Sequence, residues 1–292
     1  MDDRKTVLVT GSDGFIGRHL VPYLASRGYE VIAASRRALN FDHPNVKAIE
    51  VPDLATPFNW DPLLKQCNSV VHLAGIAHTF ASDSLYETVN HHATEALASA
   101  AARCSAHLIF VSSIAAQSGS FSDIELSEDA APKPTTPYGA SKLAAEQAIR
   151  EAGSSFTILR PVVIYGEGEK GNFATVHKIS RLPIPLPFGG LKAERSVLSV
   201  ENFCSAVVFV LSQSRARGET FIVSDPIPLT LPDIIKRYRT RAGKPPPILI
   251  SIPEKWLELA LKLGGRGAIW QRIGCPLVAQ PKKLLALGWN PS

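Results

Sequence analysis

Short apolar runs alternate with longer amphipathic stretches from the N-terminus to about Pro161. Residues 7–9 and 108–111 are apolar at every position, which is typical of strands buried on both faces of a parallel sheet. The longer stretches repeat their apolar residues with the helical period. The pattern therefore predicts an α/β fold with a doubly wound parallel sheet. The expected strands are residues 6–10, 30–34, 46–51, 69–73, 107–112 and 156–159, and the expected helices are residues 15–27, 61–67, 82–103 and 138–151.

The pattern changes after Pro161, where glycines and then the proline-rich residues 181–190 are typical of loops built around a ligand. We expect a dinucleotide-binding domain and a smaller C-terminal substrate-binding domain. The first takes residues 1–165 and is joined by about residues 196–224, which hold an apolar helix (200–211) and a last strand (220–223); the second takes residues 166–195 and 225–292.

Prolines beyond residue 226 predict short helices, of which residues 253–263 form the most apolar one. A helix of this kind can lie on a membrane surface, but its broad apolar face favours a place in a domain core.

The first expected strand runs into a glycine-rich turn that opens a helix, VLVTGSDGFIGRHL at residues 7–20. Gly11 and Gly14 carry no Cβ, so a phosphate can approach the backbone closely, and the helix that follows offers free N–H groups and the positive end of its dipole. Gly17 would let the helix pack tightly on the strand. A glycine triple in this strand–turn–helix context predicts a dinucleotide site.

Tyr138 and Lys142 stand four residues apart in YGASK, so they share one face of an expected helix. An ammonium beside a phenol stabilises the phenolate, and we expect Lys142 to lower the pKa of Tyr138 toward a range where it exchanges a proton with an alcohol or ketone. Ser112 and Ser113 end a central strand, where ligands meet parallel sheets. The hydroxyl of Ser113 could then hold the oxygen that Tyr138 protonates.

The glycine triple, VVHLAG at residues 70–75, Asn90, Ser113 and YGASK occur in the order and spacing of the extended short-chain dehydrogenase/reductases. The chain most resembles their nucleotide-sugar epimerase, dehydratase and reductase branch. The resemblance runs from residue 5 to about residue 223, and LGW at residues 287–289 shows a weaker similarity. The resemblance implies a Rossmann sheet, with Tyr138 as the acid–base, Lys142 on the ribose, Ser113 on the substrate oxygen and Asn90 in the proton path.

A cofactor site is implied by the same resemblance. Asp53 matches the adenine contact of the family, although it can equally be a surface acid. An NAD-specific site places an acid about 20 residues past the glycines, but here Ser35, Arg36 and Arg37 stand at that point. We therefore expect NADP(H), with NAD(H) as the alternative. The implied cofactor residues are Gly11, Gly14, Phe15, Ile16, Gly17, Ser35, Arg36, Arg37, Asp53, Leu54, Leu73, Ala74, Gly75 and Lys142.

Three residues match sugar-nucleotide positions of the family: Asn172 and Arg195 on the diphosphate, and Phe188 against uracil. A guanidinium pairs with two phosphate oxygens through its planar fork. The family often has a second phosphate-binding arginine further on, and Arg266 and Arg272 are the near candidates for it. The expected substrate is a UDP-sugar.

Ile114 and Ala115 stand where a 4,6-dehydratase of this family carries its acid–base carboxylates, so dehydration is excluded. The overall pattern resembles bacterial proteins that reduce 4-keto-6-deoxy-hexosamine nucleotides for surface polysaccharides. The leading hypothesis is therefore an oxidoreductase that reduces the 4-keto group of a UDP-4-keto-6-deoxy-hexosamine with NAD(P)H. Two alternatives remain: a UDP-hexose 4-epimerase with bound NAD, and a non-catalytic nucleotide-sensing protein of the same fold.

The net charge of +5 suits a phosphorylated substrate, whereas the dispersed basic residues argue against nucleic-acid binding. No apolar run reaches the roughly 18 residues that a membrane span needs, and no signal peptide is recognised. The four cysteines lie far apart with no metal-ligand spacing, so we expect reduced thiols, a cytoplasmic location and no metal. The family resemblance implies a homodimer formed through residues 82–103 and 138–151.

Overall fold

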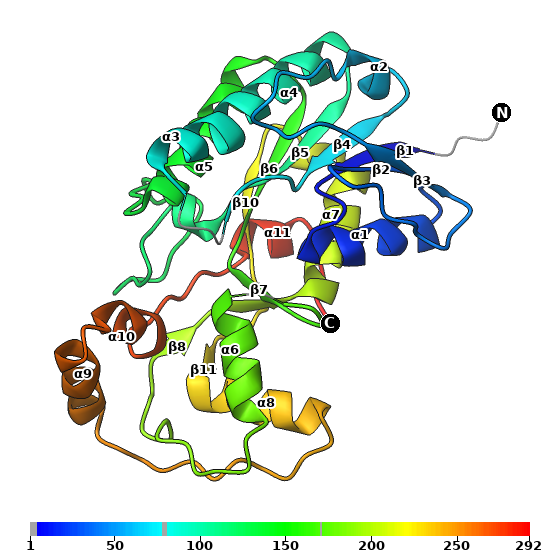
Figure 1. Ribbon diagram of the computed structural model, residues 1–292. Helices are drawn as coiled ribbons and strands as arrows, with labels where there is room; N and C mark the ends of the chain where they lie inside the picture. The colour runs from blue at the N-terminus through cyan, green and yellow to red at the C-terminus, as the bar shows by residue number, and fades with distance from the viewer. Residues whose placement is uncertain (1–4, 78–80, 170) are drawn as a thin grey trace.

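Seven parallel strands form the central sheet of the computed structural model, which describes residues 5–77, 81–169 and 171–292 (Figure 1). The strand order is β10-β6-β5-β4-β1-β2-β3, so the order reverses between β1 and β4. This topology confirms the predicted α/β doubly wound sheet, whose ligands bind at such a reversal. The strands are β1 (Thr6–Thr10), β2 (Glu30–Ser35), β3 (Val46–Glu50), β4 (Ser69–His72), β5 (His107–Val111), β6 (Phe156–Pro161) and β10 (Thr220–Val223).

Helices cover both faces of this sheet (Figure 1). One face packs against α1 (Phe15–Ser26), α7 (Val200–Ser212) and α11 (Lys282–Ala286). The other packs against α2 (Asp61–Leu64), α4 (Ala93–Arg103) and α5 (Pro137–Glu151). Val7 and Val9 enter the first core and Leu8 enters the second, which explains why the strand is apolar at successive positions.

The single helix expected at residues 82–103 is interrupted. A short helix, α3 (Asp83–Tyr86), continues into a π-helical turn at Glu87–His92 and then into α4. A π turn carries one more residue per hydrogen-bonded ring than an α turn, and such turns are frequent at functional sites. The buried Asn90 lies within this turn.

Two small sheets and four helices follow the main sheet in the lower part of the molecule (Figure 1). The helix α6 forms where the sequence predicted only loops, and α8 begins after Thr230, whose hydroxyl accepts a hydrogen bond from the Asp233 N–H. The domain division stays a prediction. The elements are β7 (Val163–Tyr165) paired with β9 (Val197–Ser199), β8 (Glu194–Arg195) paired with β11 (Leu229–Thr230), and α6 (Gly171–Ser180), α8 (Leu231–Arg241), α9 (Glu254–Leu263) and α10 (Gly267–Ile273).

The predicted core position of the most apolar C-terminal helix holds for only one of its sides. The helix forms as α9, whose Leu257 and Leu261 pack against the small core around Trp270, although none of its residues is fully buried. Its sequence contains more apolar residues than one packed face can use, so part of the apolar surface faces outward. Within the described residues, no helix combines the length and hydropathy required to cross a membrane.

Candidate active site

The glycine turn after β1 closes against the end of β4. Gly11 has a φ of +69°, a left-handed conformation that favours glycine. A Cβ at Gly11 would lie 2.9 Å from the backbone of Ala74, and a Cβ at Gly17 would lie 2.5 Å from the carbonyl oxygen of Gly11. α1 begins after Gly14, which has no side chain to cap the first N–H groups of the helix. The turn therefore fits the pyrophosphate of a dinucleotide.

The other predicted cofactor residues lie along the carboxyl edge of the sheet, where such sheets bind ligands. They are Phe15 and Ile16 in the first turn of α1, Ser35, Arg36 and Arg37 at the end of β2, Asp53 and Leu54 after β3, and Leu73, Ala74 and Gly75 after β4.

Arg36 and Asp53, which the sequence assigned to different parts of the cofactor, form an ion pair. Arg36 Nη1 lies 2.8 Å from Asp53 Oδ2, and the Ala55 N–H donates to Asp53 Oδ1 at 2.9 Å. The Ala55 and Arg36 hydrogen bonds lower the pKa of Asp53. Because 70 % of the Arg36 side chain is exposed, its guanidinium stays within reach of a ligand.

Ser113, Tyr138 and Lys142 meet where β5 ends against α5. Thr136 accepts a hydrogen bond from the Gly139 N–H and so caps the helix, which brings Tyr138 into its first turn. The Ser113 side chain lies close enough to the Tyr138 phenol to lower its pKa. One helical turn later, Lys142 Nζ donates to the carbonyl oxygen of Val111 at 2.9 Å. The structure thus brings together the three residues that the sequence singled out for proton transfer.

Burial, rather than Lys142, dominates the electrostatics of Tyr138. Desolvation raises the pKa of the phenol, the Ser113 side chain opposes that shift, and Tyr86 adds to it. Lys142 therefore does not lower the pKa of Tyr138 as the sequence predicted. Its ammonium group donates to the Val111 carbonyl. Burial also lowers the pKa of Lys142 to about 8, although Glu146 opposes this change. Tyr138 is accordingly a protonated phenol at neutral pH, ready to donate.

Asn90 ties the end of β4 to α5. Its Nδ2 donates to the Ile76 carbonyl oxygen at 3.0 Å and to Ser141 Oγ at 3.1 Å, while Oδ1 accepts from the Ile76 N–H at 2.8 Å. A Cβ at Gly75 would lie 2.9 Å from Asn90 Oδ1 and 3.6 Å from Lys142 Nζ. Asn90, Gly75 and Lys142 therefore adjoin one another.

Arg195 is turned toward backbone carbonyl groups. Its Nη1 donates to Cys275 O at 2.7 Å and to Gln271 O at 3.3 Å, and its Nη2 donates to Ser120 O at 2.9 Å. Burial lowers the pKa of this guanidinium to about 10, and the charge of Arg272 adds to the shift. Of the two candidates for the second phosphate-binding arginine, Arg272 is thus the one that interacts electrostatically with Arg195. The diphosphate role of Arg195 stays a prediction.

The two other predicted substrate residues lie in the lower part of the molecule. Phe188 packs against the small core formed by residues such as Leu191 and Trp270. Asn172 lies in the first turn of α6, and its side chain falls outside the part of the chain that the structure describes.

A groove of about 630 Å³ lies between the segment that follows Ser113 and α10. Its walls are rich in hydroxyl and amide groups, and it joins Ser120 to Gln271, two of the residues that Arg195 holds. The groove is lined by Gln117, Ser118, Gly119, Ser120, Phe121, Ser122, Ile124, Leu126, Ala130, Ala131, Lys133, Thr135 and Gln271. Its hydroxyl and amide groups, set among apolar side chains, and its position beside the loop of Ser113 make it a candidate sugar site.

A model of the NAD dependent epimerase/dehydratase family matches residues 7–224, which hold the glycine turn and the Ser113, Tyr138 and Lys142 cluster. The chain belongs to this family. It is 30 % identical to a UDP-glucose 4-epimerase of Vibrio cholerae over 98 % of this chain and 91 % of that protein. It is also 33 % identical to a ceramide reductase of Caulobacter vibrioides over 71 % of this chain and 61 % of that protein.

Solved structures share the fold of this epimerase/dehydratase family member. MoeE5 in complex with UDP-glucose and NAD has a TM-score of 0.74 at 25 % identity, covering 98 % of this chain and 93 % of that one. A UDP-glucuronic acid 4-epimerase of Bacillus cereus in complex with NAD has a TM-score of 0.76 at 21 % identity, covering 98 % and 94 %. The chain is thus an NAD-dependent short-chain dehydrogenase/reductase enzyme of the epimerase/dehydratase family.

His72 was not recognised from the sequence of this family member. Thr94 Oγ1 donates to Asn90 O, so it must accept from His72 Nε2, 3.1 Å away. His72 Nδ1 is then the acceptor for Thr10 Oγ1 at 2.7 Å. Burial, assisted by the charge of Lys142, lowers the pKa of His72 to about 3. A neutral imidazole therefore connects the end of β1 to the π turn of Asn90.

A buried ion pair behind the catalytic helix was also missed. Glu146, 1 % exposed, receives hydrogen bonds from Arg160 at 2.9 and 2.6 Å and from Ser112 Oγ at 2.6 Å. Arg160 also donates to Gln117 Oε1 at 2.8 Å. Glu146 follows Lys142 by four residues, and this spacing was the available signal.

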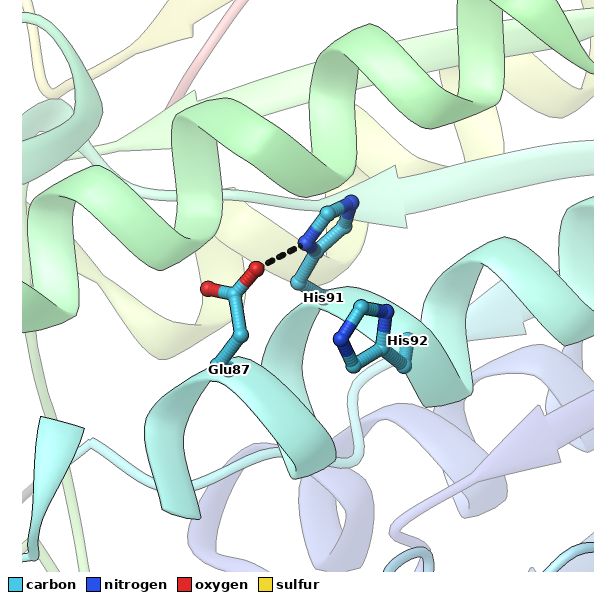
Figure 2. A group of neighbouring side chains, drawn as sticks. All are labelled: Glu87, His91 and His92. Carbon is cyan, nitrogen blue, oxygen red and sulfur yellow. Dashed lines mark hydrogen bonds and ion pairs between the residues drawn. The ribbon is translucent and has the colours of Figure 1, made fainter. Parts of the chain in front are cut away.

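Glu87, His91 and His92 form a cluster on the π turn (Figure 2). His91 Nδ1 lies 2.5 Å from Glu87 Oε1, and the rings of His91 and His92 stack 4.7 Å apart at an angle of 25°. Ring nitrogens coordinate metals in the plane of the ring at about 2.0–2.1 Å. Because two nearly parallel planes at this separation do not converge within that distance, we interpret the cluster as a helix-surface ion pair with a stacked neighbour.

Proposed function

We propose that this enzyme moves a hydride to and from C4 of a UDP-sugar. The supporting observation is the Ser113, Tyr138 and Lys142 cluster at the carboxyl edge of the sheet, beside the glycine turn that fits a dinucleotide. Nicotinamide, when bound, supplies or accepts the hydride. Lys142, whose Nζ donates to the Val111 carbonyl, would hold the ribose of the bound cofactor and keep a positive charge near the site, and Asn90 holds the adjoining backbone.

Tyr138 transfers the proton at the sugar. In the direction of reduction, the phenol gives its proton to the C4 oxygen while the C4 carbon gains the hydride, so a ketone becomes an alcohol. In the direction of oxidation, the same phenolate takes the alcohol proton back. The Ser113 hydroxyl lies near the phenol and can hold the same sugar oxygen. Ile114 and Ala115 supply no carboxylate for dehydration, so only hydride and proton exchange at C4 remains.

The first candidate reaction is 4-epimerisation, in which C4 is oxidised and then reduced on the opposite face. It is supported by the Vibrio cholerae UDP-glucose 4-epimerase, which aligns with nearly the whole chain. The second candidate is net reduction of a UDP-4-keto-6-deoxy-hexosamine, which the sequence alone favoured. One specific observation supports this second candidate. Arg36 and Arg37 follow β2 at the point where an NAD-specific site carries an acid, so their guanidinium groups can pair with the 2′-phosphate of NADP(H).

The two reactions differ in their use of cofactor, and one experiment separates them. The purified enzyme is incubated with UDP-glucose or UDP-GlcNAc without added cofactor, and products are followed by NMR. We expect the 4-epimer to accumulate with no net change in nicotinamide absorbance. If epimer is absent, and one NADPH is consumed per UDP-4-keto-6-deoxy-hexosamine with deuterium transferred from labelled NADPH to C4, the protein is a reductase. Neither product from any UDP-sugar would refute the proposal.

A further inference from the structure

The outer face of α9 is apolar and exposed. The side chains of Trp256, Leu259 and Leu263 are 67 %, 48 % and 80 % exposed. Their spacing puts all three on one side of the helix. Leu257 and Leu261 use the other side to pack against the small core around Trp270. The helix is therefore anchored by one apolar side and presents a second, which we name the α9 face: Trp256, Leu259 and Leu263.

Two further chain segments, residues 181–190 and 242–253, run along the same lower part of the molecule as α9 (Figure 1), and both carry exposed apolar side chains. Ile248 and Ile250 precede α9 and are 65 % and 49 % exposed, and Ile184, 51 % exposed, lies in the proline-rich segment. The two segments are hydrogen-bonded, since Leu186 N–H donates to Ile248 O and Ile250 N–H donates to Leu186 O.

Basic residues outnumber acidic ones in α9 and α10. Residues 254–273 hold four lysines and arginines against two acidic residues. Both acids of α9 are already engaged: Glu254 accepts a hydrogen bond from the Lys192 N–H at 2.9 Å, and Glu258 lies 2.7 Å from Lys262 Nζ. Lys255 and Arg266 are exposed beside the α9 face.

We propose that the α9 face docks on an anionic lipid surface. Tryptophan and leucine side chains enter the boundary between head groups and acyl chains, and flanking basic residues are attracted to anionic head groups. Trp256, Leu259 and Leu263 would supply the inserted part, and Lys255 and Arg266 the electrostatic part. The enzyme would then lie on a membrane without crossing it.

A second copy of the chain fits this face less well. A symmetric contact would bring the exposed Lys255 and Arg266 of one copy toward those of the other, and like charges placed together are unfavourable.

The fluorescence of Trp256 gives a direct test, because Trp60, Trp270 and Trp289 are only 3 %, 8 % and 3 % exposed. The full-length protein is mixed with phosphatidylcholine vesicles that contain about 30 % phosphatidylglycerol, with and without brominated acyl chains. We expect a blue shift, quenching by the brominated lipid, and binding at least about tenfold weaker without anionic lipid or at roughly 0.5 M salt. Equal emission with and without vesicles at low salt would overturn the proposal.

Variants separate insertion from simple charge attraction. Leu263→Ser should weaken vesicle binding by about tenfold or more, since it removes a leucine that would enter the lipid. Ile227→Ser is the matched control, because Ile227 is 67 % exposed, compared with 80 % for Leu263, but lies before β11, away from α9. Both variants should keep the wild-type turnover of soluble substrate. Equal binding of the two variants would overturn the proposal, and so would a dimer that Leu263→Ser converts to a monomer, because the occupant is then a second copy.

Discussion

His72→Gln should make the protein less sensitive to acid. In the wild type, His72 is fully buried between Thr10 and Thr94, and burial lowers its pKa to about 3. In the unfolded chain, His72 binds a proton near pH 6.5, whereas in the folded protein the imidazole stays neutral until far lower pH. The stabilisation is therefore complete above pH 6.5 and is lost as the pH falls toward 3. The glutamine of the variant has no proton to bind in this range.

The magnitude follows from the two pKa values. Between pH 7.5 and pH 5, one histidine with a folded pKa of about 3 removes about 2 kcal/mol from the free energy of unfolding. His107, whose pKa burial lowers to about 4, adds a loss of the same sign but is present in both proteins. At pH 7.5 the variant should itself be about 1–3 kcal/mol less stable, because Thr10 loses its hydrogen-bond acceptor.

Urea unfolding at both pH values measures these differences. The wild type should lose about 2 kcal/mol more than the variant between pH 7.5 and pH 5. His92→Gln, which removes an exposed imidazole from the π turn, is the control for the substitution. Parallel losses in the wild type and His72→Gln would refute the neutral, buried imidazole and the direction of its hydrogen bonds.

The remaining predictions concern the candidate active site. Tyr138→Phe should lower turnover by about two orders of magnitude or more and leave cofactor binding intact, since only the transferable proton is lost; steady-state kinetics and cofactor titration check this. Lys142→Ala should weaken cofactor binding as well as turnover, so an unchanged cofactor affinity would argue against ribose contact. Arg195→Ala should weaken UDP binding in calorimetry by about 1.5–3 kcal/mol, and equal affinity would leave it a structural residue. Arg36→Asp should shift preference from NADP(H) to NAD(H); a wild type that already binds NADH more tightly contradicts the premise.

The sheet could be predicted because its signals are local. A buried parallel strand such as β1 is apolar at successive positions, and the turn after it needs Gly11 for a left-handed φ, so both are visible in a few residues. α6 was missed because it begins at Gly171, within a glycine-rich stretch that is typical of loops. α9 was found, but its exposed apolar side was not predicted, since periodicity shows that a helix has an apolar face and not what covers it.

Some features of the candidate site could not be predicted from the sequence, because they depend on contacts between residues that lie far apart along the chain. The ion pair of Arg36 and Asp53 joins residues after two adjacent strands, and its existence depends on the pairing of β2 with β3. His72 looks like an ordinary strand residue until Thr10, 62 residues away, is placed against it. The site roles of Ser113, Tyr138 and Lys142 rested on spacing and resemblance, and the structure supplies their proximity while leaving the roles as predictions.

Successive turns along one side of α5 have different tasks, and this division explains how the site is held in register. Tyr138 and Lys142 face the carboxyl edge of β5, whereas Glu146, one turn later, binds Arg160 of β6 and Ser112. Removing one partner of such a buried pair leaves an uncompensated charge, which is strongly destabilising. Because Ser112 precedes Ser113, the same carboxylate fixes both the helix and the strand end that must meet at the substrate oxygen. The phenol–hydroxyl contact is thereby set by residues that never touch the substrate.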